Sequence, residues 1–160
     1  MNCVQVARAR DLNSTLKTMF RIRGEASRIQ IADALARVPY TALGLGSEFE
    51  IMIDSMDHCR KIRNKYAHAY WHDPDMGKAL CYVSLEELAK EDVPVNDLTN
   101  LTFFYLDEPL LLEQEAYFDF ARKFMMYLNY EGRFRSNELE HNSMTAPPML
   151  QKPQFYTWKG

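Results

Sequence analysis

A helical pattern that runs without interruption for about 24 residues is the feature that most constrains this fold. From Phe49 onward, apolar residues recur at helical spacing and not in the alternation of a strand. They are Met52, Ile53, Met56, Cys59, Ile62, Tyr66 and Tyr70. No glycine or proline follows before Pro74, and Ser47 with Glu50 forms a capping box ahead of the apolar run. The sequence therefore predicts one long helix from Ser47 to Tyr70 or slightly beyond.

Two further helical segments precede the long helix. The spacing of apolar residues predicts a first helix over about residues 4–22, which ends at Gly24, and a second over residues 25–38, which stops before Pro39. Two glycines within residues 44–46 predict a short loop before the long helix. Helices joined by such short loops pack antiparallel to one another.

The pattern changes after the long helix. Residues 78–83 and 101–106 are short, aromatic-rich and prone to form strands. Between them, Ser84 with Glu87 forms a second capping box. We expect two short strands around a helix of one or two turns, paired as an antiparallel hairpin inserted over about residues 78–106. Irregular structure packed on the helices is the alternative for this segment.

A final apolar helix and a tail complete the chain. Asp107, followed by Pro109 at the first helical position, predicts a helix that runs to about Tyr130 and is apolar on most sides. The tail that follows is polar and then proline-rich, without the periodicity of a helix or a strand. Three aromatic rings in it are unusual for a disordered segment, and we expect them to dock on this subunit or on a neighbour. They belong to Phe155, Tyr156 and Trp158.

Composition sets the class of the protein. With 160 residues, of which 47% are hydrophobic and 26% are charged, the chain can bury the core of one globular domain. The expected fold is therefore mainly α, an antiparallel helical bundle over residues 1–132 with a small two-stranded β-hairpin insertion. The tail covers residues 133–160.

The cysteines, the hydropathy and the net charge indicate where the protein is located and which partners it can bind. Cys3, Cys59 and Cys81 are odd in number and far apart, so no disulfide framework is expected. The chain opens without a secretory signal and contains no run of about 18 apolar residues, which predicts a cytoplasmic protein that does not enter the membrane. The net charge of −3 argues against a protein that coats nucleic acid non-specifically, but it is compatible with a local basic cleft.

A charged residue breaks the apolar face of the long helix. At about 100° per residue, Arg63 falls in the middle of that face. Asn64 and His68, four residues apart, lie next to each other on its flank. The face itself is formed by Met52, Met56, Cys59 and Tyr70. Because an unpaired buried arginine is very costly, Arg63 either pairs with an acidic residue in the core or faces a partner subunit or a ligand.

The run from Arg63 to His68 resembles the motif of the HEPN superfamily. That motif is an arginine, four to six intervening residues and a histidine, often with a polar residue directly after the arginine, and Arg63, Asn64 and His68 match all three positions. The resemblance covers the motif helix directly and extends loosely to the two helical segments before it and to the helix near residue 110. HEPN domains are small all-α bundles that usually dimerise. Many are metal-independent ribonucleases, and others are inactive modules that bind RNA or a partner.

The resemblance implies an endoribonuclease, acting as a toxin or defence component, with Arg63, Asn64 and His68 as catalytic residues. Histidine can serve as base or acid near neutral pH, and arginine grips a phosphate at two points. Asparagine can hold either the histidine ring or the phosphate. The alternative is a non-catalytic HEPN-like interaction module that binds RNA, a nucleotide or a protein partner such as an antitoxin.

Four neighbouring residues are candidates for substrate binding. Arg60 and Lys65 belong to the basic turn that precedes His68. Tyr66 and Tyr70 can stack on the bases of a single strand, as aromatic residues do in many proteins that bind such strands. Packing in the core or at an interface is the alternative for these two tyrosines.

The spacing within the motif predicts an oligomer. Arg63 and His68 are five residues apart and point roughly 140° apart on an ideal helix. One helix does not direct both side chains at one phosphate, whereas two copies related by a two-fold axis bring each arginine to the other copy's histidine. We therefore expect a homodimer built on the motif helix.

A metal site is an alternative use of the histidines. His68 and His72 are four residues apart, and Asp73 and Asp75 follow closely. A histidine pair at this spacing can bind zinc on one face of a helix. The general-base glutamate of the HExxH motif is missing between them, and Pro74 favours an end of the helix near His72. No metal and no other cofactor is therefore predicted.

Overall fold

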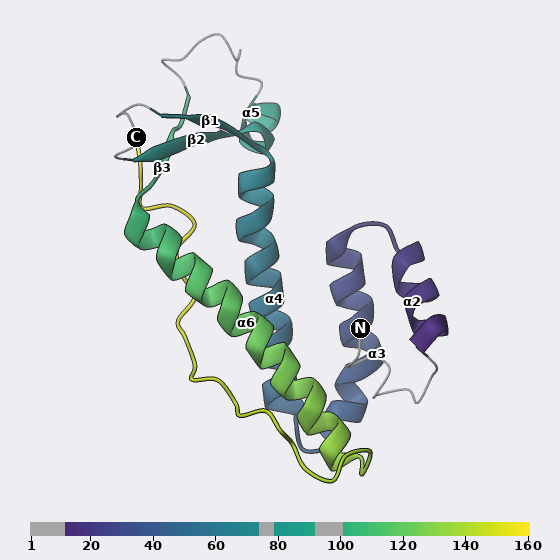
Figure 1. The fold of residues 1–160 in the computed structure, drawn as a ribbon. Helices are drawn as coiled ribbons and strands as arrows, with labels where there is room; N and C mark the ends of the chain where they lie inside the picture. Colours follow the sequence, from purple (N-terminus) through teal and green to yellow (C-terminus); the bar gives the residue numbers. More distant parts are fainter. Residues whose placement is uncertain (1–11, 74–78, 92–100) are drawn as a thin grey trace. The chain divides into compact units, whose positions relative to one another are not determined.

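The computed structural model describes residues 12–73, 79–91 and 101–160, and these residues are mainly helical. They contain five helices and a four-stranded antiparallel sheet (Figure 1). The chain divides into two compact units. Unit 1 comprises residues 1–60 and 119–150, and unit 2 comprises residues 61–118 and 151–160. The mainly α class expected from the sequence is confirmed.

Unit 1 is built from helices. It contains α2 (Leu12–Arg21), α3 (Glu25–Ala42), the first part of α4 (Gly46–Ala67) and the last part of α6 (Glu108–Arg135). The first predicted helix falls partly on residues 1–11, which lie outside the described residues.

Two of the predicted helix boundaries in unit 1 are wrong. Helix α3 does not stop before Pro39 but continues to Ala42. A proline inside a helix removes one backbone hydrogen bond. Here the next residue, Tyr40, is fully buried and stacks on Phe49 with ring centroids 5.0 Å apart, so core packing carries the helix through the proline. Helix α4 begins at Gly46, one residue before the predicted cap.

The capping box predicted at the start of α4 is not formed. Ser47 already lies inside the helix, and its hydroxyl donates a hydrogen bond to the carboxylate of Glu48 at 2.9 Å. The backbone N–H of Phe49 is satisfied by the carbonyl of Leu45 at 2.9 Å. Because this backbone bond already uses the donor that a cap would satisfy, the helix starts without a side-chain cap.

The core of unit 1 packs around the Tyr40–Phe49 pair. Each fully buried apolar side chain of this size stabilises the fold by about 1.5–3 kcal/mol relative to exposure. Gly132 lies so close to the Tyr40 ring that an added Cβ would stand 2.9 Å from its hydroxyl oxygen. The other buried apolar residues of this unit lie on its helices, apart from Leu45 in the turn between α3 and α4; they are Met19, Ala36, Leu45, Met52, Cys59, Phe120, Ala121, Phe124 and Leu128.

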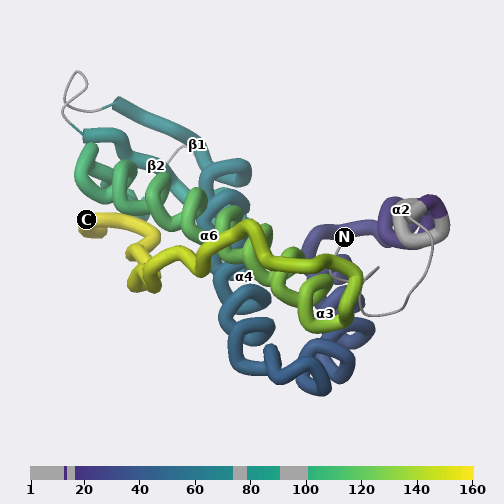
Figure 2. Tube along the Cα trace, turned by 60° about the horizontal axis from the view of Figure 1, so that its bottom comes forward, coloured from purple at the N-terminus to yellow at the C-terminus, as the bar shows by residue number. Residues whose placement is uncertain are grey.

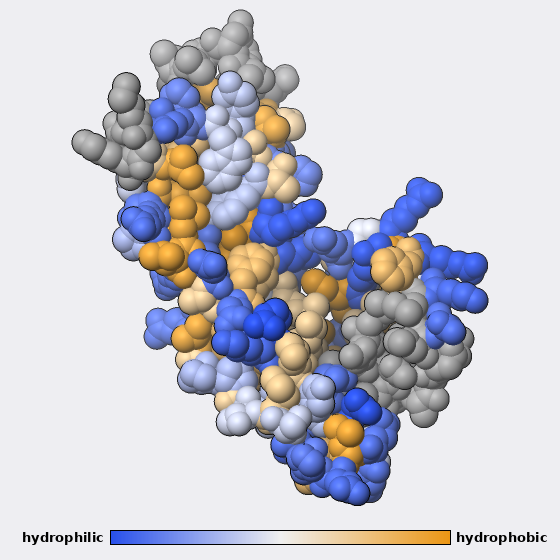
Figure 3. Space-filling view, viewed as in Figure 1, coloured by the Kyte–Doolittle hydropathy of each residue, from blue (hydrophilic) through white to orange (hydrophobic). Residues whose placement is uncertain are grey.

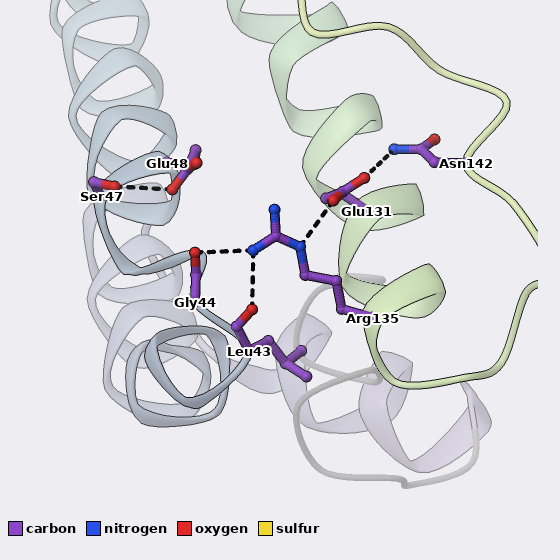
Figure 4. A network of polar contacts seen from close by, with 7 residues as sticks. All are labelled: Leu43, Gly44, Ser47, Glu48, Glu131, Arg135 and Asn142. Carbon is purple, nitrogen blue, oxygen red and sulfur yellow. Dashed lines mark hydrogen bonds and ion pairs between the residues drawn. The ribbon is translucent and has the colours of Figure 1, made fainter.

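A polar network fixes the turn between α3 and α4 to the end of α6 (Figure 4). Arg135 donates from Nη1 to the carbonyls of Leu43 and Gly44, each at 3.0 Å, and from Nε to Glu131 at 2.8 Å. Asn142 donates to the other oxygen of Glu131 at 2.7 Å. This bond, together with Arg135, lowers the pKa of Glu131 despite its partial burial. Gly44 has a φ of 71°, a left-handed conformation that favours glycine.

The segment after α6 stays on unit 1 for fifteen residues. Residues 136–150 turn back and run alongside the last part of α6 (Figure 1, Figure 2). The reversal begins at Asn137, which has a φ of 61°, and Asn142 then attaches the segment to α6 through Glu131. The final helix ends at Arg135, just before this reversal, which is five residues beyond the predicted end near Tyr130.

Unit 2 contains the sheet. Its strands are β1 (Ala69–His72), β2 (Leu80–Ser84), β3 (Phe104–Leu106) and β4 (Trp158–Lys159), and α5 (Leu85–Glu91) follows β2. The strand order is β1-β2-β3-β4, and every neighbouring pair is antiparallel. The two strands predicted from the sequence do pair with each other, but they are the centre of a four-stranded sheet and not an isolated hairpin.

The two additional strands come from segments for which the sequence predicts the end of the long helix and the tail. Helix α4 ends at Ala67 and not at Tyr70, because the next residues pair with β2: Tyr70 lies opposite Val83, and Trp71 lies opposite Tyr82. At the other edge, residues of the tail pair with β3, with Trp158 opposite Tyr105. Pairing satisfies backbone groups that water would otherwise have to satisfy.

One face of the sheet forms the core of unit 2. Tyr82, Phe104 and Leu106 pack there against Leu110 of α6, and all four are buried. Partly buried side chains complete the cluster, namely Tyr66, Ala69, Leu111 and Tyr156. Apolar side chains also reach the surface of this unit, including Leu112, which is 57% exposed. Figure 3 shows apolar patches, in orange, near the sheet and the first turns of α6.

Local signals in unit 2 are confirmed. Ser84 accepts a hydrogen bond from the backbone N–H of Glu87 at 3.3 Å, as the second capping box predicts. Asp107 caps α6 by accepting from the N–H of Leu110 at 3.1 Å.

The docking expected for the tail's rings is also confirmed. Tyr156 packs on Phe104 with ring centroids 5.0 Å apart, and Trp158 stacks on Tyr105 at 4.7 Å. Within the described part of the chain, no helix combines the length and hydrophobicity needed to cross a membrane.

Candidate functional site

The motif lies at the junction between α4 and the sheet. Arg63 and Asn64 belong to the last turns of α4, and His68 is the residue between Ala67, which ends the helix, and the first residue of β1. The N–H of His68 donates to the carbonyl of Asn64 at 3.0 Å, and its own carbonyl accepts from the N–H of Leu85 at 3.1 Å. The backbone of His68 is therefore fixed from both sides, while its side chain is exposed.

Arg63 is exposed, so the prediction that it lies in the middle of the buried apolar face of the helix is wrong. The buried positions of this stretch are Cys59 and Ile62, and Arg63 lies beside them on the solvent side. Its Nη1 donates to Oδ1 of Asn64 at 3.1 Å. Of the two alternatives for Arg63, burial within the core is excluded, and a position that faces a ligand or a second copy is compatible with its exposure.

Tyr66, a candidate for base stacking, is held in the core of unit 2. Its hydroxyl donates a hydrogen bond to Oε1 of Gln114, and its ring contacts Trp71 at 5.3 Å and Tyr82 at 6.0 Å between centroids. Burial raises the pKa of the Tyr66 hydroxyl, although the bond to Gln114 acts in the opposite direction. These contacts favour the core alternative for this tyrosine.

Lys65, a candidate for phosphate binding, is engaged by two aromatic rings. Its ammonium nitrogen lies 5.7 Å from the ring centroid of Phe104 and 5.5 Å from that of Phe155. At these distances, the negative faces of the rings attract the cation. Lys65 is half-buried, and it attaches α4 to the tail of the chain.

Tyr70 and Arg60 have different surroundings. Tyr70 lies on β1 and is 68% exposed, so its ring is open to a ligand. Arg60 belongs to unit 1, where its Nη2 forms an ion pair with Asp57 at 2.7 Å. Arg60 and Asp57 line a groove of about 340 Å³ between α3 and α4 within that unit, together with Asp33, Arg37, Glu50 and Asp54.

Gln114 is a residue that the sequence reasoning missed. It is only 3% exposed, and besides accepting from Tyr66 it donates from Nε2 to the backbone carbonyl of Gln154 at 2.7 Å. Its position in the sequence indicates its burial, because it lies four residues after Leu110 and three before Tyr117 and so shares the buried face of α6 with them. A polar residue on such a face is expected to have hydrogen-bond partners.

The histidine pair does not share a helix face. His68 lies in the turn after α4, and His72 lies at the end of β1. Helical spacing of four therefore does not apply to them. Across the residues that the structure describes, no group of three or more histidine, cysteine, aspartate or glutamate side chains is arranged to hold a metal ion. Asp75, the last residue of the predicted alternative, lies outside the described residues.

Removal of the hydroxyl is expected to lower the stability of the fold at Tyr66 but not at Tyr82. Tyr66→Phe leaves the buried Oε1 of Gln114 without its donor, which should destabilise the fold by about 1–3 kcal/mol. Tyr82 is fully buried, and its hydroxyl has no hydrogen-bond partner in the described part of the chain. Tyr82→Phe should therefore change stability by less than about 0.5 kcal/mol or increase it. Urea denaturation of both variants measures the difference, and equal losses would contradict it.

Comparison of the chain with known protein families, with curated proteins and with solved structures found no match. The features that bear on function are those of the motif itself. Arg63 is exposed, Asn64 beside it is hydrogen-bonded to it, and His68 is exposed just beyond the same end of α4.

Proposed function

We propose that the chain is a metal-independent endoribonuclease of the HEPN type, acting as a homodimer in which the motif ends of α4 from two copies form the cleft. The observation that carries the proposal is the exposure of Arg63 and His68 at one end of α4, with Asn64 hydrogen-bonded to Arg63 at 3.1 Å. Exposed motif residues are open to a substrate, whereas buried ones would be structural.

Each motif residue has a defined part in the proposed reaction. His68 takes the proton from a ribose 2′-hydroxyl, and the resulting oxygen attacks the adjacent phosphorus. The bond from phosphorus to the 5′-oxygen breaks, and that oxygen takes a proton from water. The products are a 2′,3′-cyclic phosphate and a 5′-hydroxyl. Arg63 stabilises the negative charge that develops on the phosphate oxygens, and Asn64 directs the guanidinium through its side-chain oxygen.

The dimer is part of the proposal. The HEPN resemblance implies that the motif helices of two copies meet at one cleft, and Arg63 of one copy then acts with His68 of the other. The proposal also includes an antiparallel HEPN-like helical bundle. Support for it within unit 1 is the three-residue turn, residues 43–45, that joins α3 to α4.

A non-catalytic module that binds RNA or a protein partner, such as an antitoxin, is the second candidate. The observation that favours it is the apolar surface directly beside the motif. Tyr70 is 68% exposed and Trp71 is 40% exposed on the strand that follows His68. Exposed aromatic side chains favour binding whether or not a reaction follows.

The test is cleavage of a labelled single-stranded RNA in excess EDTA. Wild type is expected to cleave and leave cyclic-phosphate ends, and His68→Ala is expected to lose at least about 100-fold in rate, because the general base is removed. His72→Ala is the matched control, since His72 is also exposed and lies four residues away, at the end of β1. Binding of the RNA without cleavage by any form would favour the second candidate. Equal loss in both variants would contradict the role of His68.

A further inference from the structure

Two consecutive motif-helix residues are held by the C-terminal strap, which we define as residues 151–160. The ammonium of Lys65 lies over the ring of Phe155. Tyr66 donates to Gln114, which in turn donates to the backbone carbonyl of Gln154. Lys65 and Tyr66 lie between Asn64 and His68, so the strap reaches the centre of the motif from a distant part of the sequence.

The strap is itself firmly attached to unit 2. Thr157 donates to the carboxylate of Asp107 at 3.0 Å, and its hydroxyl oxygen accepts from the N–H of Asp107 at 3.3 Å. Strand β4 pairs with β3, where Trp158 and Tyr105 stack with their planes 7° apart. Pro153 is buried. A strap fixed at several points can hold the last turn of α4, which carries Lys65 and Tyr66, in one orientation.

The link through Gln114 is specific in its polarity. Its amide oxygen accepts from Tyr66, and its amide nitrogen donates to Gln154. If the amide flipped, its nitrogen could still donate to the hydroxyl oxygen of Tyr66, but its oxygen would face the carbonyl of Gln154, so that bond would be lost. At 3% exposure, water has little access to replace either bond. The side chain of Gln114 therefore has one favoured orientation.

We propose that Gln114 and Phe155 are positioning residues for the motif: together they fix the Lys65–Tyr66 turn and thereby the directions of Arg63, Asn64 and His68. An effect of Gln114 and Phe155 on RNA cleavage rests on the proposed ribonuclease function. Neither residue touches the RNA. Displacement of reacting groups by about 1 Å can cost roughly 100-fold in rate, so residues that hold the turn can affect catalysis without contacting the substrate.

The chain offers matched variants for the test. Gln114→Met keeps the length of the side chain but loses both hydrogen bonds, and Gln114→Glu can accept from Tyr66 but as a carboxylate cannot donate to Gln154. Gln154→Ala is the control, because only the backbone carbonyl of Gln154 takes part. Phe155→Leu removes the ring at Lys65, and Phe155→Tyr keeps it.

Steady-state cleavage is measured at a temperature where circular dichroism shows every variant to be folded. We expect kcat to fall about 10- to 100-fold in Gln114→Met and Phe155→Leu with KM changed less than about twofold, and an intermediate loss in Gln114→Glu. Gln154→Ala and Phe155→Tyr should match wild type. An unchanged kcat in Gln114→Met and Phe155→Leu would overturn the proposal, because a merely structural role affects the folded fraction and not the turnover of folded molecules.

A second readout separates this proposal from the proposed function. In wild type, the ε-methylene protons of Lys65 should show upfield ring-current shifts in NMR spectra, because the ammonium lies over two rings. The His68 imidazole signals should move in Gln114→Met and Phe155→Leu but not in Gln154→Ala. If wild type cleaves no RNA, the ribonuclease proposal fails, and the NMR result alone decides whether the strap positions the motif. Unmoved His68 signals in both variants would overturn it.

Discussion

An equimolar mixture of Arg63→Ala chains and His68→Ala chains is expected to recover about a quarter of wild-type ribonuclease activity, although each variant alone is inactive. In the proposed dimer, each site takes its arginine from one copy and its histidine from the other. Random reassociation makes half of the dimers mixed, and each mixed dimer has one site with both residues intact. Both residues are exposed, so neither substitution removes a core contact.

This mixing experiment tests the two-copy arrangement directly. A site formed within one copy would give no recovery, since each chain lacks one of the two residues. The double variant Arg63→Ala/His68→Ala, mixed with Arg63→Ala, is the control and must remain inactive because no chain supplies the arginine. Size-exclusion chromatography at micromolar concentration should show the dimer, and a monomer at that concentration would contradict the prediction before any activity is measured.

Replacement of Gly132 with alanine is expected to destabilise the protein by about 1–2 kcal/mol, the opposite of the usual effect in a helix. An alanine in place of a glycine inside a helix ordinarily gains about 1 kcal/mol. Here the new Cβ would lie 2.9 Å from the hydroxyl oxygen of Tyr40, 3.0 Å from its Cε1 and 3.1 Å from its Cζ. Tyr40 is fully buried and stacked on Phe49, so its ring cannot move away without disturbing the core. Overpacking of this kind costs about 1–3 kcal/mol.

A double-mutant cycle checks the cause of that loss. Tyr40→Phe removes the hydroxyl and with it the shortest of the three contacts. Gly132→Ala should therefore cost less in the Tyr40→Phe background than in wild type, by about 0.5–1 kcal/mol in urea denaturation. Equal costs in the two backgrounds, or a Gly132→Ala variant as stable as wild type, would show that the helix accommodates the methyl group by another route.

The helices of this chain are predictable from its sequence, whereas the sheet is predictable only in part. Helical spacing of apolar residues depends on neighbours three and four positions away, so it is visible locally. Strand β1 was missed because Tyr70 continues the helical spacing of α4, and what makes residues 69–72 a strand is their pairing with residues 81–84. Strand β4 depends on a partner even further away in sequence.

The candidate site shows the same division. The motif from Arg63 to His68 was recognisable as a local pattern, but the exposure of Arg63 was not, because a difference of one helical position decides which face is buried. The contacts of Lys65 and Tyr66 depend on Phe155 and Gln114, which lie far along the chain. No local pattern contains that information.

The position of β4 at the edge of the sheet has a consequence for how the sheet assembles. Strands β1 and β2 are close in sequence, whereas the contact between Asp107 and Thr157, next to β4, closes a loop of 50 residues. The entropy lost on closing a loop grows by about 0.6 kcal/mol for each doubling of its length. Closure at β4 therefore costs more than closure at β1. Strand β4 itself spans only two residues, and the residues on either side of it add backbone hydrogen bonds to Phe103 and Tyr105. The contact of the strap with Lys65 can therefore form only when this 50-residue loop closes, whereas β1 and β2 can pair before it.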